Sequence, residues 1–465
     1  MLRPVLARLA AALILFASAT ACGRTVPPPP RTPTDSGDAA ARDAGDAGDA
    51  TVGDAGDATV GDAGRGAMPL GVLHTDLTLD LGALHGRAVV DHAPAESIVF
   101  EVGGLTEVQV FDGSGAAVDA PTVDGQISLP GAPTPTQWRF EYTFPAQPRG
   151  TLEGWVPESN VTLLWPYHCS NLFPCVSSPA DGTTFALSVT GTASGLTAVY
   201  PRTIAADAPS YMIAVAVGEY EVVSLGTTRA GTHLSVYHFP GERASATEGT
   251  GSLVGYVEFF ETTYGPYLFG DEMASVAVNW GAGGFGGMEH HPFFHVARPS
   301  MANPVTQAHE AAHGWFGNGV RIRCWEDFVL SEGLATYLAA RAIAAVDGPE
   351  AEARVWAGYE VDLTNTVARR DTEAWPTGCG EIDIVTHPVF SLVPYMKGAF
   401  FMRAIEREIG RDALDAILAD FYRRHGGAEA ASMGELLEDI ETRTGFDTTA
   451  LTDAWLRGLG IPPLP

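Results

Sequence analysis

The chain is poor in positive charge. Its 465 residues include 27 lysines and arginines against 56 aspartates and glutamates, a formal net charge of −29, and Lys397 is its only lysine. A protein that binds nucleic acid needs clustered basic side chains to neutralise phosphates. The charge balance therefore argues against nucleic acid as a partner. The hydrophobic share of 46% is sufficient for large buried cores in one or more domains.

The chain begins with a short apolar run. Arg3 and Arg8 precede the run LAAALILFASA, which is too short to span a membrane in the mature protein and is typical of a secretory signal over residues 1–21. The next letters, ATAC, resemble a bacterial lipobox with Ala19 in place of the usual leucine, so we expect a lipid on Cys22. Ordinary signal cleavage is the alternative. In both cases we expect export, as a lipoprotein of the bacterial cell envelope or as a secreted protein.

Cysteine is rare, with five in the whole chain. Apart from Cys22 there are four, an even number that favours disulfides in an oxidising compartment. Of the three possible pairings we predict Cys169–Cys175 and Cys324–Cys379. Zinc binding by these cysteines is the alternative, but no C-x-x-C spacing supports it.

The composition changes along the chain and predicts an α+β multidomain protein. Residues 22–67 are an acidic low-complexity tether that contains GDATVGDA twice and has no apolar face. Residues 68–245 hold short alternating segments such as WRFEYTF, which predict a β-sandwich or open β-barrel domain. Residues 246–465 follow a helical period. Within them Asn303 and Pro304 are suited to begin a helix that Asn318 and Gly319 would end.

The stretch HEAAHGWFGN begins at His309. It places His309 and His313 on one face of a helix, with Glu310 between them, in the H-E-x-x-H arrangement of zinc peptidases. Two imidazoles do not complete a zinc site. The metzincin extension is excluded because Phe316 and Gly319 occupy the positions of its glycine and third histidine.

A glutamate from the following helix is the alternative third ligand, as in the gluzincins. The stretch WEDFVLSEGLATY supplies Glu332, nineteen residues after His313. Two histidines and a glutamate leave the fourth position of a tetrahedral zinc ion for water, as catalysis requires.

Five stretches together resemble the aminopeptidase-N-type gluzincin zinc metallopeptidases, the family of membrane alanyl aminopeptidase and leukotriene epoxide hydrolase. They are WPYHCSNLFPCVSSPADGTTFALSV, GGMEH, HEAAHGWFGN, WEDFVLSEGLATY and VPYMKGAF, in the family's order. The resemblance runs from about residue 70 to the C-terminus, as in a short form without the family's C-terminal helical domain. It implies a β domain over 68–245, a thermolysin-like, mainly α catalytic domain over 246–465, and a more open cleft.

The resemblance also implies the catalytic roles. His309, His313 and Glu332 would hold one zinc ion, and Glu310 would act as the base that takes a proton from zinc-bound water. Tyr395, in YMKG, would donate a hydrogen bond to the oxyanion of the tetrahedral intermediate.

The resemblance of GGMEH to a substrate-binding motif of the family implies peptide substrates. Gly286, Gly287 and Met288 would lie beside an extended peptide, and Glu289 would bind its free α-amine and so enforce aminopeptidase action. His290 replaces the family's asparagine and forms a cluster with nearby histidines at 291 and 295. A second metal there is conceivable, with packing or hydrogen bonding as the alternative.

Several features of the sequence leave alternatives to the aminopeptidase function open. The β domain of the family supplies a second α-amine anchor where this chain has Trp165, whose ring could offer a cation–π face instead. Asn318 and Asp327 are candidates to orient the ligands or brace the two helices, or else are helix caps. The alternatives to an aminopeptidase are a zinc endopeptidase of the same fold and a non-catalytic surface protein. Epoxide hydrolysis is disfavoured because the basic residues of the C-terminal domain are missing.

Overall fold

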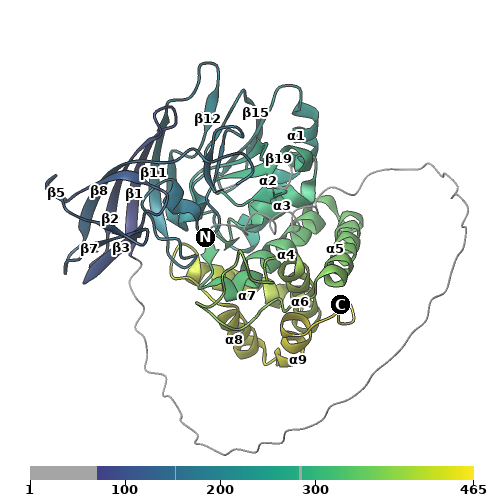
Figure 1. Ribbon diagram of the computed structural model, residues 1–465. Helices are drawn as coiled ribbons and strands as arrows, with labels where there is room; N and C mark the ends of the chain where they lie inside the picture. Colours follow the sequence, from purple (N-terminus) through teal and green to yellow (C-terminus); the bar gives the residue numbers. More distant parts are fainter. Residues whose placement is uncertain (1–70, 152, 282–284) are drawn as a thin grey trace, which may run out of the picture. The chain divides into compact units, whose positions relative to one another are not determined.

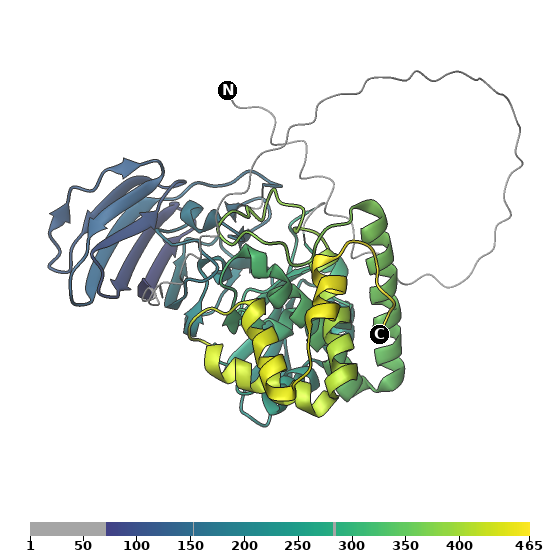
Figure 2. The ribbon, with the colours of Figure 1, turned by 90° about the horizontal axis from the view of Figure 1, so that it is seen from below.

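The computed structural model describes residues 71–465 apart from 152 and 282–284 (Figure 1). The predicted signal peptide (1–21), the lipid on Cys22 and the tether (22–67) lie outside the described residues. The described residues fall in one compact unit. Figure 2 shows the strands of its first part in purple and blue and the helices of its last part in green and yellow.

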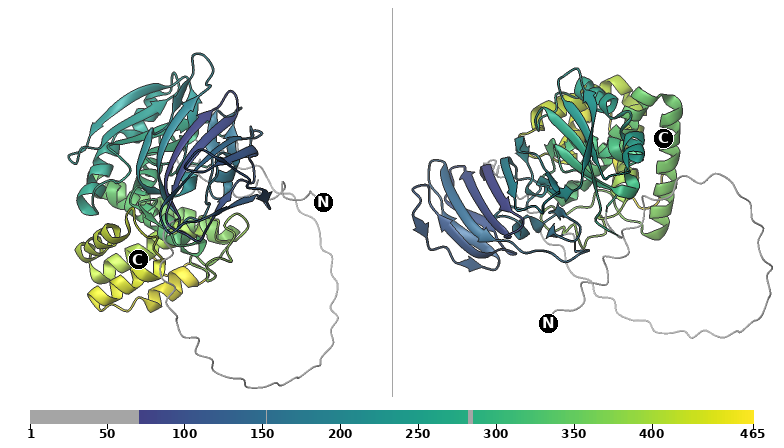
Figure 3. Two further views of the ribbon diagram at one scale, coloured as in Figure 1. Left: turned by 90° about the vertical axis from the view of Figure 1, so that its left-hand side faces the viewer. Right: turned by 90° about the horizontal axis from the view of Figure 1, so that it is seen from above.

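The first part of the unit is built from three sheets. Alternation of apolar and polar residues explains them: in β8 the side chains of Trp138, Phe140 and Tyr142 are buried and the residues between them are not. The largest sheet has the strand order β13-β11-β1-β2-β8-β4-β5, and its strands lie side by side in Figure 3. Its strands are β1 (Val72–Asp80), β2 (His85–His92), β4 (Thr106–Phe111), β5 (Ala117–Val118), β8 (Thr136–Thr143), β11 (Thr183–Thr190) and β13 (Thr203–Ala208).

Two smaller sheets accompany it. One has the order β3-β7-β6 and the other β12-β14-β10-β9. Their strands are β3 (Ser97–Glu101), β6 (Thr122–Val123), β7 (Gln126–Pro130), β9 (Gly154–Val156), β10 (Val161–Leu163), β12 (Thr197–Val199) and β14 (Ala216–Gly218).

A five-stranded sheet spans the domain boundary predicted at residue 245. Its order is β15-β16-β17-β19-β18, and β16 pairs in parallel with β17, which follows two helices later. The strands are β15 (Glu221–Thr227), β16 (His233–His238), β17 (Glu272–Val278), β18 (Gly287–Met288) and β19 (Phe293–Ala297), and the helices are α1 (Arg243–Thr250) and α2 (Leu253–Thr263). Alternation alone places β15 and β16 with the preceding strands, whereas β16 pairs in the structure with β17 of the later segment. The boundary itself stays a prediction.

The remaining chain is mainly helical. Its elements are α3 (Pro304–Ala312), β20 (Phe316–Gly317), β21 (Val320–Arg321), α4 (Phe328–Asp347), α5 (Pro349–Arg369), α6 (Val393–Ile409), α7 (Arg411–His425), α8 (Met433–Thr444) and α9 (Thr449–Thr452). The segment Trp325–Asp347 is apolar and long enough to cross a membrane, but 83% of its most apolar window is buried inside the structure. It is a core helix.

The helix that carries the H-E-x-x-H motif begins as predicted and ends earlier. The side chain of Asn303 accepts a hydrogen bond from the backbone N–H of Val305 at 3.0 Å, and a proline occupies the first turn. The helix ends at Ala312, not at Asn318. The backbone N–H groups of Asn318 and Gly319 both turn back to the carbonyl of His313, which closes the helix end.

Helices α4 and α6 approach unusually closely. A Cβ added to Gly333 would lie 2.8 Å from the Cα of Gly398, closer than real Cβ atoms come. The two glycines therefore let the backbones touch. Their sequence neighbours Glu332 and Tyr395 are thereby brought to the same site.

Lys397 is fully buried on α6. Its ammonium group donates to the carboxylate of Asp371 at 3.3 Å, to the carbonyl of Thr372 at 3.3 Å and to the carbonyl of Gly458 at 2.8 Å. All three of its donors are satisfied, as burial of a charge requires. The only lysine of the chain thus links α6 by hydrogen bonds to two segments that are distant in sequence.

Both predicted disulfides are present. Cys169 is bonded to Cys175 and Cys324 to Cys379. The second bond links Cys324, shortly before α4, to the loop between α5 and α6.

Candidate active site

The structure brings the three predicted metal ligands together. The Nε2 atom of His309 lies 3.1 Å from Nε2 of His313 and 3.1 Å from Oε2 of Glu332, and His313 Nε2 lies 3.4 Å from the same oxygen. Ligand atoms about 2.0–2.2 Å from a tetrahedral zinc ion lie about 3.3–3.6 Å from one another. The three atoms thus fit one zinc ion with little movement, and two imidazoles with one carboxylate are the donor set of a catalytic site.

The other ring nitrogens of the two histidines are held by their surroundings. The Nδ1–H of His313 donates to the carbonyl of Phe316 at 3.1 Å, and Nδ1 of His309 lies 3.4 Å from the hydroxyl of Thr336. Such contacts fix the tautomer that leaves Nε2 with its lone pair free for a metal. Thr336 was not among the residues predicted from sequence. Its spacing of four from Glu332 on α4 was the available signal, since it places both side chains on one helix face.

Glu310 lies against the backbone of Gly287. A Cβ at Gly287 would lie 2.2 Å from Oε1 of Glu310, so only glycine leaves room for this carboxylate. Burial raises the pKa of Glu310 well above its usual range, and Glu289 and Glu332 raise it further against the opposing effect of His313. A carboxyl group with a raised pKa is suited to take up and return a proton near neutral pH.

Tyr395 packs over one of the ligands. Its ring stacks on that of His309, with centroids 5.7 Å apart and an interplanar angle of 17°, and its edge contacts Phe328. Burial, with Glu332, Glu289 and Glu310, raises the pKa of Tyr395 well above its usual value. Its hydroxyl therefore stays protonated and can donate a hydrogen bond.

Glu289 faces the same centre. Its carboxylate belongs with Glu310 and His313 to a buried group whose ligand atoms all lie within 4.8 Å of one another. Burial, followed by the charge of Glu332, raises the pKa of Glu289 to about 7 against the effect of His313. A buried carboxylate among other carboxylates is a strong site for a cation such as an ammonium group.

The residues before Glu289 form the edge of the five-stranded sheet. Gly287 and Met288 pair with β19, and the carbonyl of Gly286 accepts from the N–H of Ala297 at 2.9 Å. β18 is the last strand in the sheet order, so its other side can pair with an extended peptide.

One prediction was that Asn318 and Asp327 orient the metal ligands. Their side chains make other contacts instead. The amide of Asn318 donates to the carbonyl of Glu289, and Asp327 accepts from the backbone N–H of Met433 at the start of α8, at 2.9 Å. Both brace segments that are far apart in sequence, which no local motif reveals.

Comparison with known proteins agrees with this geometry. Residues 297–455 match the peptidase family M1 domain. This matched segment, which holds all three predicted metal ligands, is thus similar to an M1 peptidase domain. The family match begins at the end of β19, so Glu289 lies before it.

The chain is similar in sequence to several proteins named as aminopeptidases. It is 29% identical over 281 residues to leucine aminopeptidase 2 of Neurospora crassa, covering 55% of this chain and 41% of the relative. It is 31% identical over 274 residues to leucine aminopeptidase 2 of Ajellomyces capsulatus (55% and 42%), and 25% identical over 432 residues to aminopeptidase M1-D of Oryza sativa subsp. japonica (83% and 46%). The chain thus spans less than half the length of these three relatives.

Solved structures show the same fold. The M1 zinc metallopeptidase of Deinococcus radiodurans aligns with a TM-score of 0.70 at 21% identity, covering 85% of this chain and 96% of that one. Native yeast LTA4 hydrolase aligns with a TM-score of 0.69 at 20% identity, covering 85% and 69%. The predicted α+β multidomain class is confirmed.

Trp165 is buried in an aromatic cluster. Its ring lies 5.0 Å from that of Phe390, 5.7 Å from Trp325 and 6.0 Å from Phe285, and the residue is 6% exposed. Little of its face is left to meet an ammonium ion, so the cation–π contact considered from sequence finds no support here. The carboxylate of Glu289, in contrast, lies with those of the candidate site.

The histidines after Glu289 do not form a second metal site. His291 uses both ring nitrogens, accepting from the hydroxyl of Tyr267 and donating to the carbonyl of Glu310, each at 2.8 Å. Within the described residues, the groups of three or more possible ligands both lie at the site above. Hydrogen bonding is therefore the better interpretation for His291, and packing for His290, whose ring nitrogens have no hydrogen-bond partner among the described residues.

The lowered pKa values of two of these histidines predict that the folded protein loses stability in acid. Burial lowers the pKa of His295 to about 3, and burial with the neighbouring histidines lowers that of His290 well below its usual value. In the unfolded chain histidines bind protons below about pH 6.5, whereas in the folded protein these two stay neutral. The free energy of unfolding is therefore unaffected by them above about pH 6.5 and decreases as the pH falls below it. At pH 5 His295 alone costs about 2 kcal/mol.

The change His295→Gln should therefore reduce the loss of stability between pH 7.5 and 5, measured as the shift in the urea midpoint. His85→Gln, at an exposed position of β2, is the matched control and should behave as the wild type. Parallel shifts for His295→Gln and wild type would contradict the prediction.

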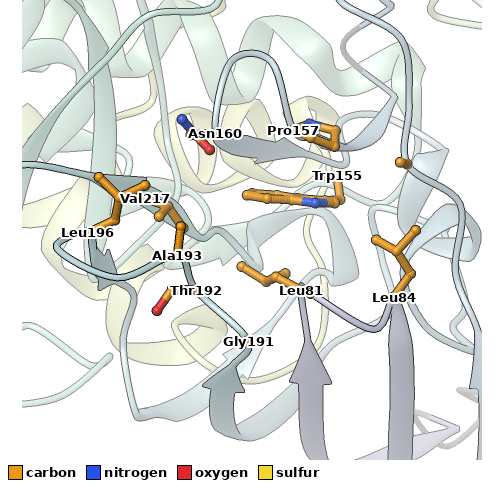
Figure 4. Close-up of a pocket in the computed structure, with 12 residues that line it drawn as sticks. Leu81, Leu84, Trp155, Pro157, Asn160, Gly191, Thr192, Ala193, Leu196 and Val217 are labelled. Carbon is orange, nitrogen blue, oxygen red and sulfur yellow. The ribbon is translucent and has the colours of Figure 1, made fainter.

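A separate cavity of about 320 Å3 lies among the strands of the first part, away from the metal ligands. Figure 4 shows Trp155 between Pro157 and Leu81 at its wall. None of the described residues that line it has a titratable side chain. It offers no chemistry of its own.

Proposed function

We propose that this protein is an M1 peptidase, a zinc-dependent aminopeptidase that hydrolyses the first peptide bond of peptides. The observation that carries the proposal is that Glu289, an ammonium-binding carboxylate, lies within 4.8 Å of the base Glu310 and the ligand His313. A peptide whose α-amine binds Glu289 and which pairs with β18 has its first carbonyl close to the metal ligands. An exopeptidase needs this short spacing.

The residues of the chain account for the steps of the reaction. Bound zinc lowers the pKa of its water from ~15.7 to ~7. Glu310 accepts the proton of the attacking water and passes it to the leaving amine, as its raised pKa allows. Tyr395 keeps its proton and donates a hydrogen bond to the oxygen of the scissile carbonyl as negative charge develops there.

A zinc endopeptidase is the competing function, because Trp165 stands in place of a second anchor. A charge-assisted hydrogen bond to an ammonium contributes roughly 1.5–3 kcal/mol, or about 10- to 150-fold in kcat/KM. With one anchor we expect a real but reduced preference for free N-termini. A non-catalytic role is disfavoured because ligands, base and tyrosine are all brought together.

The test compares matched peptides with free and acetylated N-termini. Acetylation should slow cleavage at the first bond by at least about tenfold, and Glu289→Ala should remove most of that difference because it removes the ammonium partner. Cut sites are mapped by mass spectrometry, and bound zinc is measured in every sample.

Glu272→Ala, at the exposed start of β17, is the matched control and should keep the preference of the wild type. Equal rates on both peptides, or cuts spread through the interior, would favour the endopeptidase.

The N-terminal residues support a further part of the proposal, that the enzyme is exported and carries a lipid on Cys22. Its peptide substrates would then be extracytoplasmic. The mass of the mature N-terminal fragment, purified from membranes, tests this directly.

A further inference from the structure

Asn318 links the metal-binding helix to the strand end that carries Glu289. It is fully buried, and its backbone N–H donates to the carbonyl of His313 at 3.1 Å. Its side-chain amide donates to the carbonyl of Glu289. Asn318 thus joins a metal ligand, through its backbone, to the residue proposed to bind the α-amine, through its side chain.

A second side chain completes the link. The hydroxyl of Tyr211 donates to Oδ1 of Asn318 at 3.4 Å, and Tyr211 comes from a short turn (Ser210–Met212) in the strand-rich first part of the chain. Burial, with Glu289 and Glu332, raises the pKa of Tyr211 well above its usual value, so the hydroxyl keeps the proton it donates. Because this contact occupies the amide oxygen, the NH2 group of Asn318 is the end that faces Glu289.

Glu289 needs such a restraint. Its carboxylate is buried beside those of Glu310 and Glu332, which repel it whenever they are ionised. Its carbonyl receives two hydrogen bonds, one from Asn318 and one from the backbone N–H of His291 at 2.8 Å. Holding the carbonyl fixes the start of the side chain, and so the distance between the anchor and the metal ligands.

We infer that Asn318, supported by Tyr211, is a positioning residue that sets how well the enzyme distinguishes free from blocked N-termini. The inference rests on the proposed function and deepens it. Asn318 does not touch the substrate. It acts through Glu289, and the first part of the chain contributes to substrate selection through Tyr211.

The experiment measures kcat and KM of the zinc-loaded full chain on matched free and acetylated peptides. Asn318→Leu keeps the size of the side chain and removes its hydrogen bonds. The ratio of kcat/KM between free and acetylated peptide should fall about tenfold, with the loss mainly in KM for the free peptide and with zinc content unchanged. Tyr211→Phe removes one hydroxyl and should lower the ratio about two- to threefold. Asn365→Leu, at an exposed position of α5, should leave the ratio unchanged.

The outcomes separate this inference from the proposed function. A wild type without preference for the free peptide overturns the proposed function and the inference with it. A wild-type preference that Glu289→Ala removes, but that Asn318→Leu and Tyr211→Phe both retain, overturns the inference alone. Where Asn318→Leu does not fold, Tyr211→Phe decides: a lowered ratio at normal zinc content supports the inference, and an unchanged ratio refutes it.

Discussion

Replacing Glu310 by glutamine is expected to lower kcat by about 10²–10⁴ while zinc stays bound. The amide has nearly the size of the carboxylate, so it fits the space that Gly287 leaves. It cannot accept the proton of the attacking water, and it has none to return to the leaving amine. The ligands at 309, 313 and 332 are untouched. The measurement pairs zinc content by mass spectrometry with turnover of aminoacyl fluorogenic amides.

Two further variants make the result specific. Glu248→Gln, at an exposed position of α1, should keep both zinc and activity. His313→Ala should lose the metal and with it the activity, because two ligands hold zinc far less well than three. A Glu310→Gln protein with the turnover of the wild type would show that another group is the base.

Local sequence signals were sufficient for much of the metal site. The asparagine–proline start of α3 fixes the helix on which His309 and His313 are four apart, and that spacing puts both rings on one face. Pro394 lies in the first turn of α6, as expected of proline. Such signals depend on residues within one helical turn of each other, so they can be recognised in the amino-acid sequence alone.

Contacts between distant segments could not be read in this way. Asn318 meets Glu289 across 29 residues, and Lys397 meets Gly458 across 61. The sheet formed by β15 to β19 likewise joins segments on both sides of a boundary placed by composition. In each case the packing of the whole chain determines which residues meet, and such contacts produce no periodic pattern in the sequence. The resemblance marked Asn318 and Lys397 as notable residues, but only the structure shows what they hold.

The change Tyr395→Phe is expected to lower kcat by about 10²–10³ and to leave zinc content and KM nearly unchanged. Phenylalanine keeps the ring that stacks on His309 and contacts Phe328, so the packing of α6 against the ligands is preserved. What is lost is one O–H donor, kept protonated by its buried, acidic surroundings. Its hydrogen bond strengthens as charge moves onto the carbonyl oxygen, so its removal raises the energy of the transition state more than that of bound substrate.

The matched control for this prediction is Tyr237→Phe, which removes a hydroxyl from β16 and should leave turnover intact. The kinetics are measured with free dipeptide amides, and the affinity for a non-hydrolysed dipeptide analogue is measured by calorimetry. A loss that appears in affinity instead of kcat would make Tyr395 a substrate-binding residue. An unchanged kcat would remove it from the mechanism, and the oxyanion would then need a different donor at the same face of the zinc site.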